Sequence, residues 1–260
     1  MRVLGRVPAA VAVAAALLAA AAASARGELR RGADAAAERA LDGDTLALQG
    51  GRVLRLAGVL APRAGDRGRG AADAAAAARA ALERLARGKA LMLWYGELAE
   101  DRHGRLFAQA QTADGLWLAD ELLRLGHARV FTQPGGAERA AEMLKAEAEA
   151  RAARRGLWAL AAYAVRGDEE AGRDADSFQI VEGRVLKAAA AREIVYLNFG
   201  RDIRRDFTVG IDRTAMRGFR RAGIDPKSLE GKRIRIRGWV LWRGGPYIGA
   251  THPEQLEVLD

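Results

Sequence analysis

Two short segments hold the residues of this chain whose types and spacing could do chemistry. Asp42 and Asp44 flank a glycine just before an apolar stretch, so two carboxylates would emerge where a strand begins. Paired carboxylates there could bind a hard cation such as calcium, although Asp-Gly is also a common turn dipeptide. Arg55 alternates with two leucines, so its guanidinium is expected either at a solvated edge or as a phosphate clamp. The turn at 101–105 adds three possible cationic donors, which could equally form a solvated hairpin tip.

Composition excludes several other kinds of site. The 260 residues contain no cysteine, which excludes disulfides, Cys-bound zinc, iron–sulfur clusters and thiol nucleophiles. The 3 histidines lie too far apart in sequence for a local multi-His metal site. Lys and Arg number 42 against 33 Asp and Glu, and this net charge of +9 favours polyanionic partners.

Residues 1–25 are typical of a signal peptide. Two early arginines precede an apolar run over 8–23, and small residues at its end form a cleavage site after Ala25. The run is shorter than the roughly 20 residues that a membrane-spanning helix needs. We therefore expect a periplasmic or secreted protein with no integral membrane span after processing; an uncleaved anchor helix is the alternative.

Hydrophobic periodicity and turn residues predict the elements that position the acidic and basic groups. After a poorly ordered lead-in at 26–39, we expect a β-rich domain over 40–165 with a hairpin around two glycines at 50–51. The predicted strands are 45–48, 52–59, 90–95 and 106–112, and the predicted helices are 71–87, 118–125 and 137–155.

A second domain is expected over 178–260, after an acidic linker at 166–177. Its predicted strands are 178–185, 194–199, 207–211, 232–242 and 247–258, with a helix from about 213 to 222. This order is that of an OB-fold, a small closed β-barrel, although an SH3-like barrel or an open sheet could share it. The predicted fold class is therefore α+β and rich in β, with two small barrels.

The motifs, taken in order, resemble those of the thermonuclease (staphylococcal nuclease-like) family. The resemblance covers about 40–160 and rests on Asp42-Gly43-Asp44-Thr45, Arg55 to Pro62, Asp101 to Arg105, Trp117 to Ala128 and Glu147 to Trp158. It implies an OB barrel of five strands with three helices, and calcium-dependent hydrolysis of DNA or RNA phosphodiesters. By the same resemblance, Asp44 is a metal ligand with Asp42 nearby, while Arg55 and Arg105 are phosphate clamps that stabilise the transition state.

The chain departs from this family at two positions. The family segment usually reads Asp-Thr-Pro-Glu or Asp-Ala-Pro-Glu, whereas here it begins with Leu60 and ends with Arg63. Leu60 therefore replaces a metal carboxylate, and Arg63 replaces the general base. We expect calcium binding to be weak or absent and hydrolysis to be reduced or lost. The alternative is an active calcium-dependent nuclease that uses Asp42 or Asp66 to complete the site.

Arginines predict salt-dependent binding of DNA or RNA phosphates, although GC-rich coding also produces an excess of arginine. On a predicted strand of the second domain, arginines alternate with isoleucines, which gives the strand a basic outer face beside aromatic residues. The predicted phosphate-binding arginines are Arg63, Arg67 and Arg69 in the loop and Arg233, Arg235 and Arg237 on that strand. A cell-envelope module that binds other polyanions is a further alternative, and the oligomeric state stays open.

Overall fold

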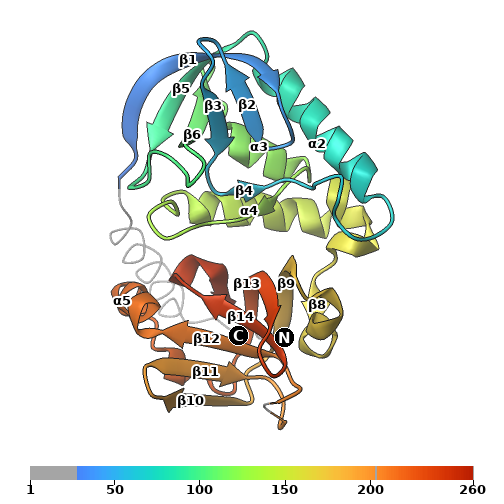
Figure 1. Ribbon diagram of the computed structural model, residues 1–260, viewed down its shortest axis with the longest axis vertical. Coiled ribbons are helices and arrows are strands. Elements are labelled where there is room, and N and C mark those ends of the chain that lie inside the picture. Colours follow the sequence, from blue (N-terminus) through green and yellow to red (C-terminus); the bar gives the residue numbers. More distant parts are fainter. Residues whose placement is uncertain (1–27, 203, 260) are drawn as a thin grey trace, which may run out of the picture.

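The computed structural model describes residues 28–202 and 204–259, so the predicted signal peptide lies outside the described residues. Two β-rich domains lie one above the other along the long axis of the molecule (Figure 1). The predicted α+β, β-rich fold class is confirmed. No helix in the described part of the chain has the length and apolar character needed to cross a membrane.

The first domain is a closed barrel with the strand order β1-β2-β3-β6-β5. Its strands are β1 (Arg30–Ala40), β2 (Thr45–Leu48), β3 (Val53–Leu56), β5 (Ala90–Tyr95) and β6 (Leu106–Thr112). The expected lead-in at 26–39 is wrong from residue 30 onward, because β1 pairs with both β2 and β5 and closes the barrel. Ala37 and Ala40 of this strand are buried in the barrel core.

Three α-helices pack against the barrel, as predicted. They are α2 (Ala71–Ala86), α3 (Leu118–Arg124) and α4 (Ala140–Ala152). Leucines from the barrel and from α2 and α3 form one buried cluster, in which each fully buried side chain contributes roughly 1.5–3 kcal/mol. A two-stranded sheet of β4 (Val59–Leu60) and β7 (Arg129–Val130) lies on the side of the barrel that faces the second domain (Figure 1).

The acidic segment at 166–177 is not a separate linker, because it packs as part of the second domain. The chain leaves α4 through two short 3-10 helices, η1 (Gly156–Ala159) and η2 (Ala161–Tyr163), and then forms β8 (Arg166–Gly167) and η3 (Asp168–Asp174). β8 pairs in parallel with β9, and Ala171 of η3 is fully buried. Arg166 Nε also donates to Asp174 Oδ2 at 2.6 Å, which neutralises one of the acids.

The second domain is an open eight-stranded sheet with the order β10-β11-β12-β14-β13-β9-β8, and β15 pairs with β13. Its remaining elements are β9 (Ser177–Arg184), β10 (Lys187–Ala191), β11 (Ile194–Asn198), β12 (Thr208–Asp212), α5 (Arg213–Arg221), η4 (Pro226–Leu229), β13 (Arg233–Trp242), β14 (Pro246–Ala250), η5 (Pro253–Gln255) and β15 (Leu256–Val258). Within the described residues no pairing joins β10 to β8, so an open sheet stands where a second closed barrel was expected.

The two domains share a hydrophobic cluster. Trp158 and Tyr163 follow the last helix of the first domain, and they pack with Phe178 and Ile180 from β9. Phe131, just after β7, meets Phe178 edge-on, with 5.4 Å between the ring centroids. The second domain is therefore packed directly against the part of the first domain that carries β4 and the loop after it.

Candidate functional site

The carboxylate of Asp44 is completely buried, and internal groups bind both of its oxygens. Oδ2 accepts a hydrogen bond from the Ala61 backbone N–H at 2.7 Å. Oδ1 lies 2.8 Å from Arg63 Nη2 and 3.1 Å from Arg55 Nη1. Burial raises the pKa of Asp44, and the two guanidiniums only partly oppose that shift. This carboxylate is therefore engaged in an internal ion-pair network.

Arg55 is a buried cation held by the backbone around it. Its Nη1 donates to the carbonyls of Asp44 at 3.3 Å and Leu56 at 3.0 Å, and its Nη2 donates to that of Val59 at 2.7 Å. Burial lowers the pKa of Arg55, while the carboxylate of Asp44 acts in the opposite direction. A phosphate could use this guanidinium only by displacing these partners.

Arg63 bridges the two acidic residues of the predicted metal site. Its Nη2 binds Asp44, and its Nη1 lies 3.4 Å from Asp42 Oδ2. Although burial would raise the pKa of Asp42, the Asp44 backbone N–H and Arg63 lower it. The guanidinium thus supplies positive charge at the point where these two carboxylates converge.

The residues present do not fit a calcium ion. Calcium needs about six to eight oxygen ligands, and Leu60 supplies none from its side chain. Both oxygens of Asp44 are already bonded, and Arg63 would repel a second cation. Among the residues that the structure describes, no three acidic or histidine side chains are grouped so that they could hold a metal ion.

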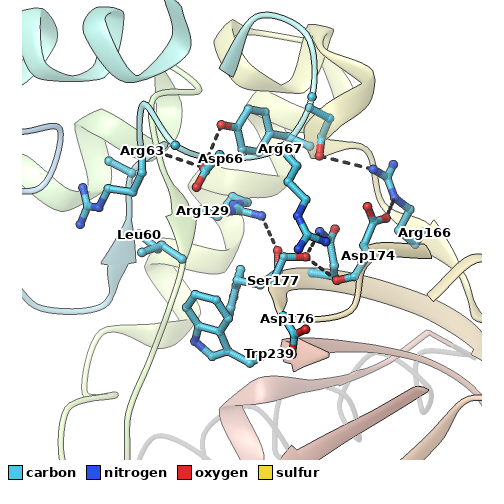
Figure 2. A pocket seen from close by; sticks show the side chains of 17 residues that line it. Leu60, Arg63, Asp66, Arg67, Arg129, Arg166, Asp174, Asp176, Ser177 and Trp239 are labelled. Atoms are coloured by element: carbon cyan, nitrogen blue, oxygen red, sulfur yellow. Dashed lines mark hydrogen bonds and ion pairs between the residues drawn. The ribbon is translucent and has the colours of Figure 1, made fainter. Parts of the chain in front are cut away.

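Asp66 does not complete the site either. Its Oδ2 accepts hydrogen bonds from the Arg63 backbone N–H at 3.1 Å and from the Tyr163 hydroxyl at 2.9 Å. Burial and the charge of Asp66 raise the pKa of Tyr163 above its ordinary value, so the phenol remains a donor. Figure 2 shows the Arg63 guanidinium pointing away from Asp66.

Arg105 forms an ion pair within its own turn. Its Nε and Nη2 lie 2.7 and 2.6 Å from Asp101 Oδ2, and Asp101 Oδ1 accepts backbone N–H groups of the same turn. The loop arginines differ from it, because Arg67 and Arg69 are exposed and have no carboxylate partner in the described residues. The structure therefore brings Asp42, Asp44, Arg55 and Arg63 together. Arg105 lies close enough for its charge to act on Arg55, although its own carboxylate partner is Asp101.

The predicted basic outer face of β13 is wrong. Sheet register places Arg235 opposite Glu182 of β9 and Glu257 of β15, and it binds both carboxylates. Arg237 is buried at the domain interface, with ion pairs to Glu147 and Glu257. Only Arg233 remains mostly exposed, 3.8 Å from Glu182. The alternating pattern predicts that the arginine-bearing face of β13 is exposed, whereas neighbouring strands and the first domain cover it.

A pocket of about 520 Å³ lies between the two domains, beside the loop in which the sequence differs from the family pattern (Figure 2). Residues 60–68 form one wall, and residues 174–179 with Trp239 form the other. Buried Arg129 of β7 also lines the pocket, and the sequence interpretation missed it. Arg129 stands between the apolar Ala128 and Val130, the same local pattern that singled out Arg55, and this signal could have found it.

Comparison with known families supports the assignment of the first domain. The family model described as staphylococcal nuclease homologue matches residues 53–160. Residues 53–160 of the first domain are therefore similar to the staphylococcal nuclease-like family, as predicted, and β1 and β2 of the barrel lie before the matched segment. A search of curated proteins found no match.

Proposed function

We propose that this protein binds nucleic acid and that its nuclease-like domain has reduced or lost phosphodiester hydrolysis. The observation that carries this proposal is the Arg63 guanidinium, which bridges Asp42 and Asp44 at the position where the family resemblance implies a general base. The predicted signal peptide would place this binding activity in the periplasm or outside the cell.

The ion pairs of Arg63, Arg55 and Arg105 support loss of hydrolysis. A general base must accept a proton from the attacking water. Asp44 and its hydrogen bond raise the pKa of Arg63 despite partial burial, so this guanidinium stays protonated and cannot accept one. Stabilisation of the transition state also needs cations free to face the phosphoryl oxygens, whereas Arg55 and Arg105 are already bound to carboxylates.

Binding of a polyanion needs cations that no carboxylate neutralises, and the described residues offer two groups of them. One group comprises Arg67 and Arg129, which line the pocket, and Arg69, which lies on the same loop as Arg67. The other lies on α5, where Arg217, Arg220 and Arg221 are exposed on one helical face and have no ion-pair partner in the described part of the chain. The α5 arginines replace β13 as the basic surface of the second domain.

A titration with labelled single-stranded DNA and RNA, scored for both binding and cleavage, tests this function. We expect binding in EDTA that weakens with salt, with log K falling by about 0.7 per tenfold rise in salt for each neutralised phosphate. We expect cleavage near background with or without calcium. Robust calcium-dependent cleavage that Asp44→Ala abolishes would instead establish an active nuclease and give Asp42 or Asp66 the missing role.

A parallel titration with heparin and anionic vesicles separates nucleic acid from other polyanions. Binding to either of these, with no binding to the oligonucleotides at low salt, would favour the cell-envelope module. The oligonucleotides, heparin and vesicles are compared at matched charge and ionic strength. If salt weakened the binding of all of them equally, the protein would be recognising negative charge in general and not nucleic acid.

A further inference from the structure

The pocket between the domains has an unusual cation in its wall. Arg129 is only 5% exposed, and its Nη1 donates to the Phe178 carbonyl at 2.8 Å. Its Nε is buried with no hydrogen-bond partner. No carboxylate within the described residues lies close enough to form an ion pair with it.

Aromatic rings surround the Arg129 guanidinium. Its central carbon lies 5.0 Å from the centroid of the Tyr163 ring and 4.9 Å from that of Phe178. These cation–π contacts stabilise the charge only in part. Burial lowers the pKa of Arg129, although Asp66 and Tyr163 oppose that shift. A buried cation without a counterion is costly, and an anion that enters the pocket would compensate it.

The opposite end of the pocket presents an aromatic surface. Trp239 is 50% exposed and packs edge-on against Phe178, with 6.4 Å between the ring centroids. Phe178 therefore contacts both the indole and the buried guanidinium. Figure 2 shows Arg67 reaching from the loop toward residues 174–177, and Trp239 at the other end of the pocket. Among the residues that the structure describes, Arg67 donates to the Ala175 carbonyl at 3.2 Å and pairs with no carboxylate.

Three acids also line the pocket, and two of them are engaged. Asp174 is paired with Arg166, and Asp66 accepts the Tyr163 hydroxyl. Asp176 is exposed. The interior of the pocket thus combines a buried cation that has no ion-pair partner among the described residues with an accessible indole, and an anion attached to a flat ring would satisfy both.

We propose that this pocket binds one nucleotide of a single strand, with its phosphate at Arg129 and Arg67 and its base against Trp239. This site rests on the proposed nucleic-acid binding, and it is formed by the nuclease-like and second domains together. A single strand fits because its bases are free to stack on protein aromatics, whereas those of a duplex are stacked on each other. No metal takes part.

The test uses the full mature chain in EDTA and a labelled single strand of about 15 nucleotides, a length within known site sizes. Trp239→Ala should weaken binding about 5- to 150-fold, the range for loss of one base–aromatic stack. Arg67→Ala should weaken binding and reduce the salt slope by about 0.7. Adenosine 5′-monophosphate should compete with the strand better than adenosine or inorganic phosphate.

Two control variants match these changes outside the pocket. Trp242→Ala removes an indole that is 62% exposed, and Arg39→Ala removes an exposed arginine of β1. Both should bind like the unmodified protein. A thermal melt shows whether Arg129→Met folds. If it does not fold, the variants of the exposed residues Trp239 and Arg67 test the pocket proposal.

The outcomes separate the pocket from the broader function. If the unmodified protein binds the strand and Trp239→Ala binds equally well, the pocket proposal is overturned while nucleic-acid binding stands. If the unmodified protein binds no oligonucleotide at low salt, the proposed function itself fails, and the pocket proposal fails with it.

Discussion

Arg237 of β13 donates from Nη1 to both carboxylate oxygens of Glu147 in α4, at 3.1 and 2.9 Å. The two side chains are 1% and 0% exposed, so a cation of the second domain is buried against an anion of the nuclease-like domain. Glu147 also accepts the Val130 backbone N–H at 2.7 Å, and Arg237 Nη2 binds Glu257 at 2.6 Å. This network fixes how the two domains dock.

Arg237→Ala should lower the free energy of unfolding by about 3–5 kcal/mol, because it leaves the buried carboxylate of Glu147 without its main partner. Urea denaturation measures the change. The matched control is Arg213→Ala, which breaks a pair with Glu193 whose side chains are 79% and 66% exposed. The control should cost about 0–1 kcal/mol, and equal losses for the two variants would contradict the proposed importance of the buried pair.

Leu60→Asp combined with Arg63→Glu should create calcium binding and raise hydrolysis. The double change removes one of the two internal cations from Asp44 and restores a metal carboxylate and a base. General-base assistance is typically worth about 10² to 10⁴ in rate, and neither single change should give as much because ligand and base act together. Calcium should also raise the Tm of the double variant alone. A calcium-dependent Tm shift in the unmodified protein would show that its site already accepts the metal.

Stability should fall as the pH is lowered from about 6.5 to about 4, and His252 should cause part of this loss. Burial lowers the pKa of His252 from 6.5 to about 4, while Nε2 and Nδ1 form hydrogen bonds with the hydroxyls of Thr132 and Thr251, respectively. In that window the unfolded chain binds a proton that the folded chain does not, so the free energy of unfolding decreases by up to about 3 kcal/mol.

Urea denaturation of His252→Gln across the same pH range checks this assignment. The variant should show a shallower dependence on pH, with a residual slope from His127, whose pKa burial also lowers. Identical slopes for the variant and the unmodified protein would exclude His252 as a source of the pH dependence.

The arginines of α5 should set much of the salt dependence of binding. Arg217→Gln together with Arg221→Gln should reduce the slope of log K against log salt by up to about 1.4, since each neutralised phosphate contributes about 0.7 on a single strand. Arg39→Gln controls for the loss of an exposed charge on the first domain. If the α5 variant and the control keep the same slope, the polyanion does not contact this helix.

The sequence predicts most elements of this fold because their signals are local. Helix α2 follows its i,i+4 charge pairs and ends just before Gly88, and the hairpin of β2 and β3 follows its glycine pair. Strand β1 has no such signal, since its alanines and charges become a strand only through pairing with β2 and β5. Non-local pairing of this kind cannot be read from composition.

In the candidate site, too, the sequence predicts the features that have local signals and misses those that depend on distant segments. Motif order locates Asp44, Arg55 and Arg63, and the structure brings them together. Alternation along β13 correctly places Arg235 and Arg237 on the face opposite the isoleucines, but the acids and the domain that cover this face come from distant segments. For Arg129, burial also depends on the second domain, whose Phe178 carbonyl is its hydrogen-bond acceptor.

The pairing of Glu147 with Arg237 has a consequence for how this chain can change over generations. A gene fragment that ended near residue 165 would encode a nuclease-like domain in which Glu147 and Arg129 had lost their partners from the second domain. Recombination that exchanged the second domain would have to supply an equivalent of Arg237 or replace Glu147 in the same event. The two halves are therefore expected to be inherited as one unit.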